Sequence, residues 1–252
     1  MSRLFVSVFA FLSVLSCSPH LSVHQINTKN IQVNVQTSSI DSLVQLMVKP
    51  FRDSISNDMS KLVVVSATPL VKDKPESKLT NLVADIILKY GRNYCISQNP
   101  DVKPDAAYVN YGGLRASLPQ GKITVGHVFE LMPFENELVL IRISGESVVQ
   151  MAERIAARGG EGIAGMKIGI RNGKPGTLTV GGKMVDPVAS YWLVTNDYIA
   201  NGGDQMSMFL NPFERIDTKI KIRDLLIQAM NEQYRKEGIL DFKEDGRIFN
   251  EH

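Results

Sequence analysis

The residues with the clearest chemical potential lie in one short stretch, residues 110–115, which reads Asn-Tyr-Gly-Gly-Leu-Arg and follows a short apolar run. Gly112 and Gly113 can adopt backbone angles that a Cβ atom disfavours, so the chain can approach a ligand closely here. Asn110 and Arg115 would then supply a side-chain amide and a guanidinium beside that approach. The pattern predicts a binding turn, and the alternative is a hairpin turn with a solvated arginine.

Two further stretches each place an aromatic ring in a polar loop next to an apolar run. Phe134 lies in the segment 132–136, directly before the strand-like run 137–143. Tyr198 lies in the segment 195–204, which follows another apolar run and ends in Gly-Gly-Asp. A packed core does not fully claim rings in such loops, where binding residues are concentrated. Both rings are therefore candidate binding residues.

Together these stretches resemble the C-terminal, substrate-binding domain of the 5′-nucleotidase family, which includes periplasmic UDP-sugar hydrolases and animal ecto-5′-nucleotidase. The resemblance runs from about Glu76 to about Gln233. Its motifs follow one another in order, and this order makes it specific. They lie at residues 76–85, 110–115, 133–134 and 196–204.

The resemblance implies roles for individual side chains. In that family two aromatic rings sandwich the base of the nucleotide, and the matching positions are Phe134 and Tyr198. The ribose and orienting contacts of the family fall on Asn110, Arg115 and Asp204. The ligand that the resemblance implies is therefore a nucleotide or a nucleoside.

Two positions depart from the family pattern. A further basic contact falls on Lys78, where relatives usually carry arginine, and a lysine ammonium does not bind bidentately as the planar guanidinium does. On the residues alone, the alternative for Lys78 is a solvated charge. Tyr111 stands where the family often has glycine, and we expect its ring to narrow the pocket.

The family's hydrolytic chemistry belongs to a separate N-terminal domain, where two metal ions in a cluster of Asp, His and Asn activate water. His127 stands alone in a short predicted helix, with no Asp-x-His or Gly-Asn-His arrangement near it. The other histidines are His20, His24 and His252. No Ser/His/Asp system with a positioned base is evident either. We therefore expect no catalytic residue, metal site or cofactor in this chain, and divalent metals in a partner chain.

The N-terminal residues 1–17 have the features of a bacterial lipoprotein signal peptide. Arg3 precedes an apolar run at 4–15, which is too short for a membrane span of about 20 residues, and the small residue Ser16 comes directly before Cys17. We predict that Cys17 is lipidated and anchors the protein in the bacterial cell envelope, on the periplasmic or outer-membrane side. The alternatives are an ordinary secretory signal and a buried N-terminal strand.

The rest of the chain predicts a tether and one domain. Residues 18–40 are rich in Ser, Asn, Gln and Thr and predict a polar tether, and residues 41–252 predict a 5′-nucleotidase C-terminal-like domain. At the start of this domain, residues 41–59 predict a helix with Asp41 as its N-cap and a kink at Pro50.

Strands and helices are interspersed along this domain. Apolar spacing predicts a buried strand at 62–65 and helices at residues 79–90, 126–131, 147–157 and 219–236, the first of them closed by Gly91. Residues 166–186 predict antiparallel hairpins, and the glycine-rich segment 159–165 is interpreted as a flexible connection. The pattern indicates an α+β fold with antiparallel or mixed sheets, and the resemblance implies a four-layer α/β/β/α arrangement.

Length and charge set broader limits. A chain of 252 residues with 44% hydrophobic content suffices for one large domain or two small ones. A formal net charge of +2 gives no electrostatic reason to expect a nucleic-acid partner, for which a clustered basic face would be needed.

These observations leave two main functional hypotheses. In the first, the chain is the substrate-binding half of a split 5′-nucleotidase, and a separate metallophosphatase chain hydrolyses the phosphate ester. In the second, it is a stand-alone nucleotide- or nucleoside-binding lipoprotein without hydrolysis. A third, weaker interpretation is a surface adhesin that retains only the fold.

Overall fold

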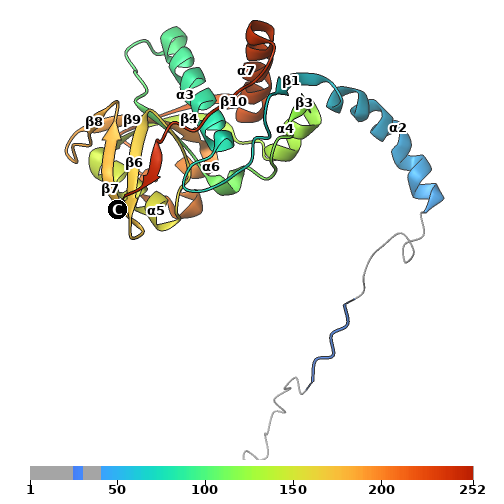
Figure 1. The fold of residues 1–252 in the computed structure, drawn as a ribbon, viewed down its shortest axis with the longest axis horizontal. Helices are drawn as coiled ribbons and strands as arrows, with labels where there is room; N and C mark the ends of the chain where they lie inside the picture. Colours follow the sequence, from blue (N-terminus) through green and yellow to red (C-terminus); the bar gives the residue numbers. More distant parts are fainter. Residues whose placement is uncertain (1–24, 31–40, 252) are drawn as a thin grey trace, which may run out of the picture. The chain divides into compact units, whose positions relative to one another are not determined.

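The computed structural model describes residues 25–30 and 41–251. Cys17, the predicted signal peptide and most of the predicted tether lie outside the described residues. The chain divides into two units, and the strands lie in the unit Pro50–His252 (Figure 1).

Helix α2 (Ser42–Met59) has the predicted N-cap. The carboxylate of Asp41 accepts hydrogen bonds from the N–H groups of Leu43 and Val44, at 3.0 and 3.2 Å. The helix continues through Pro50, and none of its residues is buried. Within the described part of the chain, neither this helix nor any other combines the length and the apolar character that crossing a membrane requires.

A five-stranded sheet forms the centre of the fold. Its strands are β2 (Ala106–Val109), β4 (Glu137–Ser144), β5 (Gly162–Ala164), β9 (Ser190–Asn196) and β10 (Glu214–Lys221). They are ordered β10-β4-β9-β2-β5. β2 runs parallel to β9, and β4 runs antiparallel to β9 with Leu138 opposite Asn196. The chain therefore leaves β2, leaves β9 and enters β4 at one edge of the sheet, which brings the three predicted binding loops together.

Helices α3 (Lys78–Gln98) and α7 (Ile222–Glu237) share a hydrophobic core with one face of this sheet (Figure 1). The predicted end of α3 at Gly91 is wrong. Gly91 is buried inside the helix against Val194, where an added Cβ would lie 2.7 Å from the valine side chain. The glycine therefore serves close packing of the helix on strand β9 and does not end the helix, which continues to Gln98.

The predicted start of the last helix at residue 219 is also wrong. Residues 219–221 complete strand β10, and Lys221 pairs with Glu137 of β4. Helix α7 therefore begins at Ile222, whose N–H donates to the carbonyl of Asn136 at 3.0 Å. A sheet partner distant in sequence decides this boundary, and local apolar spacing does not contain that information.

Helix α5 (Gly145–Ala157) and a four-stranded sheet share a second hydrophobic core with strands of the central sheet. The strands of the smaller sheet are β6 (Met166–Arg171), β7 (Lys174–Val180), β8 (Lys183–Met184) and β11 (Ile248–Asn250), ordered β11-β6-β7-β8. β6, β7 and β8 form the predicted antiparallel hairpins, and β11 adds in parallel to β6. Stacked helices and mixed sheets confirm the predicted α+β class.

The glycine-rich segment 159–165 is not the flexible connection that its composition suggests. The N–H groups of Gly159 and Gly160 bond to carbonyls in the last turn of α5, each at 3.0 Å. Residues 162–164 form the buried strand β5, which pairs with β2. Hydrogen bonding and burial therefore fix a segment whose composition alone is typical of a linker.

A small antiparallel sheet completes the domain. It consists of β1 (Leu62–Ser66), which includes the predicted buried strand, and β3 (Gly121–Thr124). Helix α4 (Val125–Leu131) follows β3 and confirms the predicted short helix. Thr124 caps this helix by accepting a bond from the N–H of His127.

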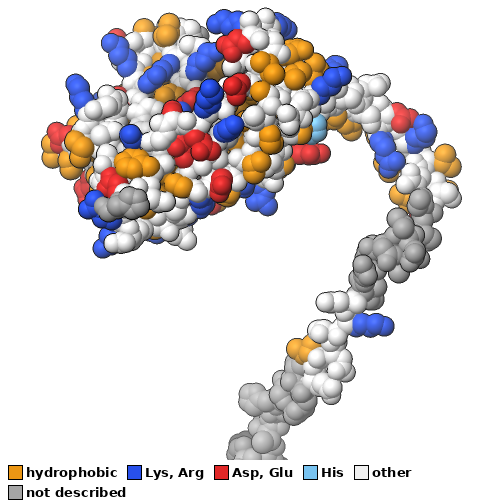
Figure 2. All heavy atoms as spheres, in the orientation of Figure 1, with side chains coloured by type: hydrophobic (Ala, Val, Ile, Leu, Met, Phe, Trp, Pro, Cys, Tyr) orange, Lys and Arg blue, Asp and Glu red, His pale blue; other side chains and the backbone are white. Residues whose placement is uncertain are grey.

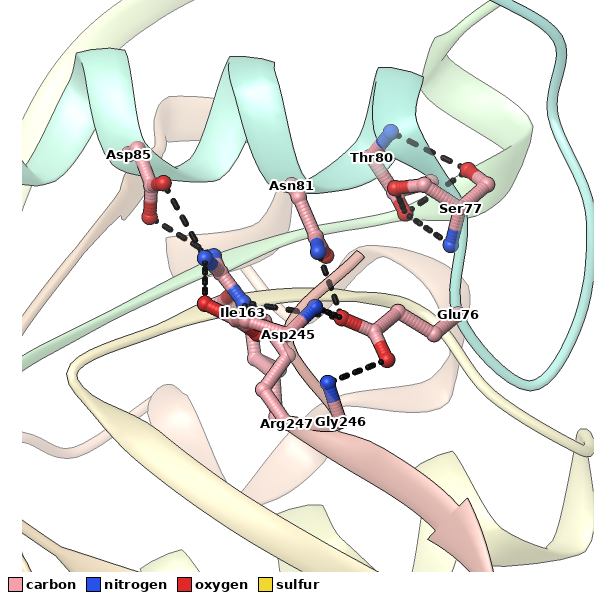
Figure 3. A network of polar contacts seen from close by, with 9 residues as sticks. All are labelled: Glu76, Ser77, Thr80, Asn81, Asp85, Ile163, Asp245, Gly246 and Arg247. Atoms are coloured by element: carbon pink, nitrogen blue, oxygen red, sulfur yellow. Dashed lines mark hydrogen bonds and ion pairs between the residues drawn. The ribbon is translucent and has the colours of Figure 1, made fainter. Parts of the chain in front are cut away.

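A mostly buried arginine, Arg247, links the C-terminal segment to α3 (Figure 3). Arg247 donates to both carboxylate oxygens of Asp85, at 2.6 and 3.0 Å, and to both of Asp245, at 2.8 and 2.7 Å. Glu76 accepts from the Asp245 N–H at 3.0 Å and from the Asn81 amide at 2.5 Å. The acidic and amide residues of the first family motif therefore anchor the C-terminal segment.

The surface charge is mixed. Figure 2 shows Lys and Arg side chains interspersed with Asp and Glu over the viewed face of the domain, and no region of that face is dominated by one sign. This face therefore offers no basic stripe of the kind that tracks a nucleic-acid backbone.

Candidate functional site

One cavity at the edge of the five-stranded sheet collects the predicted binding loops. Its volume is about 330 Å³. It is lined by Asn110, Gly112, Gly113, Arg115, Phe134, Asn136, Tyr198 and Asp204. Every predicted substrate-binding residue except Lys78 belongs to this set. Asn136 is an addition, and it lies two residues beyond Phe134 in the same loop.

A buried amide orients the polar side of the cavity. The Nδ2 group of Asn110 donates to Asp204 Oδ2 at 2.6 Å, and its Oδ1 accepts from the side-chain amide of Asn196 at 3.2 Å. Asn196 in turn caps helix α6 (Asp197–Ala200) by accepting from the Ile199 N–H at 2.7 Å. Because both ends of the Asn110 amide are engaged, its orientation is determined.

The absence of a side chain at Gly113 leaves room for the Asn110 amide beside it. An added Cβ on Gly113 would lie 2.8 Å from Asn110 Oδ1, which is closer than real Cβ contacts come. The tight Tyr-Gly-Gly turn, a short 3₁₀ segment at Tyr111–Gly113, thus folds against the amide that it positions. The backbone of the two glycines therefore packs closely against the Asn110 side chain and also lines the cavity.

The carboxylate of Asp204 is fixed by a second loop residue. The hydroxyl of Tyr198 donates to Asp204 Oδ1 at 3.1 Å and accepts from the Asp204 N–H at 3.2 Å. Asp204 has φ +52°, in the left-handed region that costs a non-glycine residue about 1 to 3 kcal/mol. Such strain persists only where neighbours hold the backbone, and here it lies in the loop that faces the cavity.

The two aromatic rings of the site are left available by the fold. Phe134 and Tyr198 are each 47% exposed, and both line the same cavity from different loops. Exposed rings that face one cavity can stack on a flat heteroaromatic ligand, and every nucleobase has a flat face of this kind. The hydroxyl of Tyr198 is engaged with Asp204, which fixes the position of its ring.

A buried arginine from α7 supports the loop that carries Phe134. Arg223 is 5% exposed and donates to the carbonyls of Met132 and Pro133, at 3.3 Å each. It also donates to Glu135 at 3.0 Å, so the guanidinium holds the backbone just before Phe134 and the side chain just after it. Hydrogen bonds from Lys221 and Arg223 lower the pKa of Glu135.

Cations lie next to the binding turn. Arg115 Nη1 donates to the Gly112 carbonyl at 3.3 Å. Lys72 Nζ donates to the carbonyls of Tyr111 and Leu114, at 3.2 and 2.6 Å. Burial and the nearby Arg115 guanidinium lower the pKa of Lys72. The turn therefore presents positive charge on the side where Arg115 lines the cavity.

Lys78 and Tyr111 lie elsewhere than the sequence suggests. Lys78 does not line the cavity, and its ammonium donates to Thr68 Oγ1 at 3.2 Å. Tyr111 does not narrow the cavity, because its ring lies against the ammonium groups of Lys72 and Lys74, at 4.1 and 4.9 Å from the ring centroid. The departure of Tyr111 from the family pattern is accommodated outside the cavity.

Sequence reasoning missed a buried acid beneath the binding turn. Glu161 is 4% exposed, and its Oε2 accepts a hydrogen bond from the Tyr111 N–H. Burial raises the pKa of Glu161, and the hydrogen bond from Tyr111 and the charge of Arg158 oppose that rise. The available signal was a lone carboxylate inside a segment that is otherwise made of glycine and small apolar residues.

The described residues do not fit a dimetal centre. Among residues 25–30 and 41–251, no group of three or more His, Cys, Asp or Glu side chains is arranged to hold a metal ion. His127 instead accepts a bond from the Thr124 N–H at 3.1 Å, in the cap of α4. The metals that the family resemblance implies therefore have no ligand set among these residues.

The chain matches a known family. The family model described as "5'-nucleotidase, C-terminal domain" matches residues 61–211, and the chain belongs to this family. The resemblance seen in the sequence and the predicted fold type are thereby confirmed.

Individual relatives show how much of a longer protein this chain resembles. A 5'-nucleotidase of Vibrio cholerae serotype O1 is 25% identical over 189 residues, which cover 70% of this chain and 33% of that protein. An apyrase of Tabanus yao is 28% identical over 163 residues, covering 56% of this chain and 28% of the relative. The solved 5'-nucleotidase precursor of Thermus thermophilus shares the fold, with a TM-score of 0.72, 24% identity, and coverage of 83% and 43% of the two chains. The chain thus spans less than half the length of these relatives.

Proposed function

We propose that this chain binds the nucleoside part of a nucleotide. The base lies between Phe134 and Tyr198, and the sugar lies against the Asn110–Asp204 pair. The observation that carries the proposal is the pair of half-exposed rings that line one cavity together with an oriented amide and carboxylate. Membership in the 5'-nucleotidase C-terminal domain family supports the same ligand class.

The chemistry of each group suits this role. Stacking on two rings is tolerant of base identity because every base has a π face. The Asp204 carboxylate can accept hydrogen bonds from the hydroxyl groups of a ribose, and Asn110 keeps one of the carboxylate oxygens oriented. Arg115 at the cavity wall adds a cation on the side open to an anionic substituent.

Hydrolysis is proposed to reside in a separate metallophosphatase chain that carries the divalent metals. The sequence supports this because its histidines do not form the cluster that the family's catalytic domain uses. The purified chain should then hydrolyse no nucleotide with any divalent metal, and activity should appear when the partner is added. Turnover that stays with this chain through rigorous purification would contradict this part of the proposal.

A lipid anchor at Cys17 in the bacterial cell envelope is the remaining part of the proposal. It is supported by the short apolar run that ends in Ser16 and Cys17. Cys17→Ala should release the protein from membranes, whereas Cys95→Ala, which changes a buried thiol, should not. A Cys17→Ala variant that still fractionates entirely with membranes would overturn the anchor.

Calorimetric titration of the wild-type chain tests the binding proposal. Adenosine should bind more tightly than adenine, because only the nucleoside engages both the rings and the Asn110–Asp204 pair. No measurable adenosine binding, alone or with the metallophosphatase chain present, would overturn the proposed function. Appearance of binding only with that chain present would favour the split enzyme over a stand-alone binding protein.

A further inference from the structure

The end of helix α5 contacts the loop that supplies Asp204. Arg158 Nη2 donates to the backbone carbonyl of Asp204 at 2.5 Å. Arg154, one helical turn earlier, donates to the side-chain oxygen of Gln205 at 3.3 Å. Two arginines on one helix face therefore meet two consecutive residues of the binding loop.

These two loop residues have an unfavourable backbone. Asp204 and Gln205 have φ values of +52° and +62°, and neither is glycine. A consecutive pair in the left-handed region is costly, so external contacts must hold it. The Tyr198 hydroxyl holds the Asp204 N–H, and Arg158 holds the Asp204 carbonyl.

Arg158 is also connected to the binding turn after β2, through Glu161. Its Nη1 donates to Glu161 Oε1 at 3.4 Å, and Glu161 Oε2 accepts from the Tyr111 N–H at the binding turn. Lys74 donates to the Arg158 carbonyl and lies over the ring of Tyr111. A continuous chain of contacts therefore joins the turn after β2 to the loop after β9 behind the cavity.

We propose that Arg158 is a positioning residue that sets the separation between the turn after β2 and the loop after β9. It acts through Glu161 and the Asp204 carbonyl, and in this way it determines the preference for a nucleoside over a free base. The proposal rests on the proposed function. Arg158 does not line the cavity, so it acts on the ligand only through the loops that it joins.

The contact between Arg158 and the Asp204 carbonyl affects the side of the cavity that is proposed to bind the sugar. Arg158 holds the backbone of Asp204, and the Asp204 carboxylate is the group that Asn110 orients across the cavity. Phe134 lies in the loop before β4, which Arg223 supports, so its ring does not depend on Arg158. Loss of Arg158 should therefore reduce binding of the sugar more than stacking of the base.

The test compares adenosine and adenine binding to the full chain carrying Arg158→Met, with Arg235→Met, at an exposed arginine in the last turn of α7, as the matched control. Arg158→Met should weaken adenosine binding about tenfold and adenine binding by a smaller factor, because Asp204 also fixes the ring of Tyr198 but not that of Phe134. Arg235→Met removes an arginine from a different helix and should leave both affinities within about twofold of wild type.

A double-mutant cycle separates positioning from a general loss of structure. If Arg158 acts through Asp204, Arg158→Met should cause no further loss of adenosine affinity in an Asp204→Ala background. Glu161→Gln keeps an acceptor for the Tyr111 N–H and provides a milder second variant, with an adenosine loss smaller than that of Arg158→Met.

Several results would overturn the proposal. Equal losses for adenosine and adenine, additive losses in the cycle, or wild-type affinity in a folded Arg158→Met variant would each do so. The last result would leave the proposed function intact, because the wild type would still bind adenosine. Absence of adenosine binding by the wild type would instead remove the proposed function itself.

Discussion

Asn110 and Asp204 are 94 residues apart in the chain, yet the Asn110 amide donates to the Asp204 carboxylate across 2.6 Å. The parallel pairing of β2 and β9 makes this contact possible, because Asn110 directly follows β2 and Asp204 lies in the loop that follows β9 and α6, at the same end of the sheet. The cavity therefore has a polar side that is assembled by sheet topology rather than by one continuous loop.

Gly113→Ala should disturb this pair without unfolding the domain. The new Cβ would meet Asn110 Oδ1 at 2.8 Å, and the end of an asparagine side chain can move aside. We expect adenosine affinity to fall about tenfold with little change in melting temperature. At Gly112 a Cβ comes no closer than 4.0 Å to the Asn110 and Asp204 side chains, so Gly112→Ala should cost less. Equal or larger losses for Gly112→Ala would contradict this explanation.

Arg223→Met should loosen the loop that carries Phe134. The change leaves the carbonyls of Met132 and Pro133 without their donor, which costs about 1 to 3 kcal/mol in the free energy of unfolding. Adenosine and adenine affinities should fall together, because base stacking is the affected interaction. Arg235→Met, in the exposed last turn of the same helix, is the control for thermal melts and calorimetry. A selective loss for adenosine would argue against this role.

Glu161 should make stability depend on pH in a defined direction. Burial raises its pKa above the ordinary value of 4.5, so the folded state retains the proton to a higher pH than the unfolded chain. Stability should therefore decrease as pH rises from 4.5 through the raised pKa, and the decrease should stop above it. The charged or titratable groups that act on Glu161 or are acted on by it are Arg158, Lys74, Lys72 and Tyr108.

The Glu161→Gln variant isolates this contribution. The melting temperature of the variant minus that of the wild type should increase across that pH window, because the variant lacks the buried charge. Thermal melts of both proteins in a buffer series measure the difference. A difference that decreases as pH rises would show that the Arg158 and Tyr111 contacts outweigh burial.

Arg247→Met should destabilise the domain without altering ligand recognition. The variant leaves the partly exposed carboxylates of Asp85 and Asp245 without their guanidinium partner and removes the cation 3.9 Å from the buried Glu76, which should cost about 1 to 3 kcal/mol in the free energy of unfolding (Figure 3). Adenosine affinity, measured well below the melting temperature, should stay within about twofold of wild type. Chemical denaturation and calorimetry together check this, and a stable variant with weakened binding would contradict it.

The sequence predicts the site better than it predicts the elements around it. Asn110, Phe134, Tyr198 and Asp204 could be named because each lies in a motif beside an apolar run, where local pattern and family order coincide. Their meeting in one cavity depends on strand order, which the residues alone do not contain.

The errors have a common physical origin in contacts distant in sequence. Gly91 resembles a helix stop but is required by Val194, and residues 159–165 resemble a linker but supply β5. Lys78 does not line the cavity and its ammonium bonds to Thr68, so a ligand contact at Lys78 stays a prediction. Glu161 stands out in sequence only as a lone carboxylate, and its partner is the backbone N–H of Tyr111, which side-chain patterns do not reveal.

The two aromatic rings provide the most direct test of the account. Adenosine is titrated calorimetrically into the wild type, Phe134→Ala, Tyr198→Ala and the control Phe213→Ala, whose exposed ring lies outside the cavity, with thermal melts alongside. We predict that Phe134→Ala and Tyr198→Ala each weaken binding by roughly one to two powers of ten, while Phe213→Ala leaves it unchanged. Unchanged adenosine affinity in properly folded Phe134→Ala and Tyr198→Ala variants would contradict the central claim.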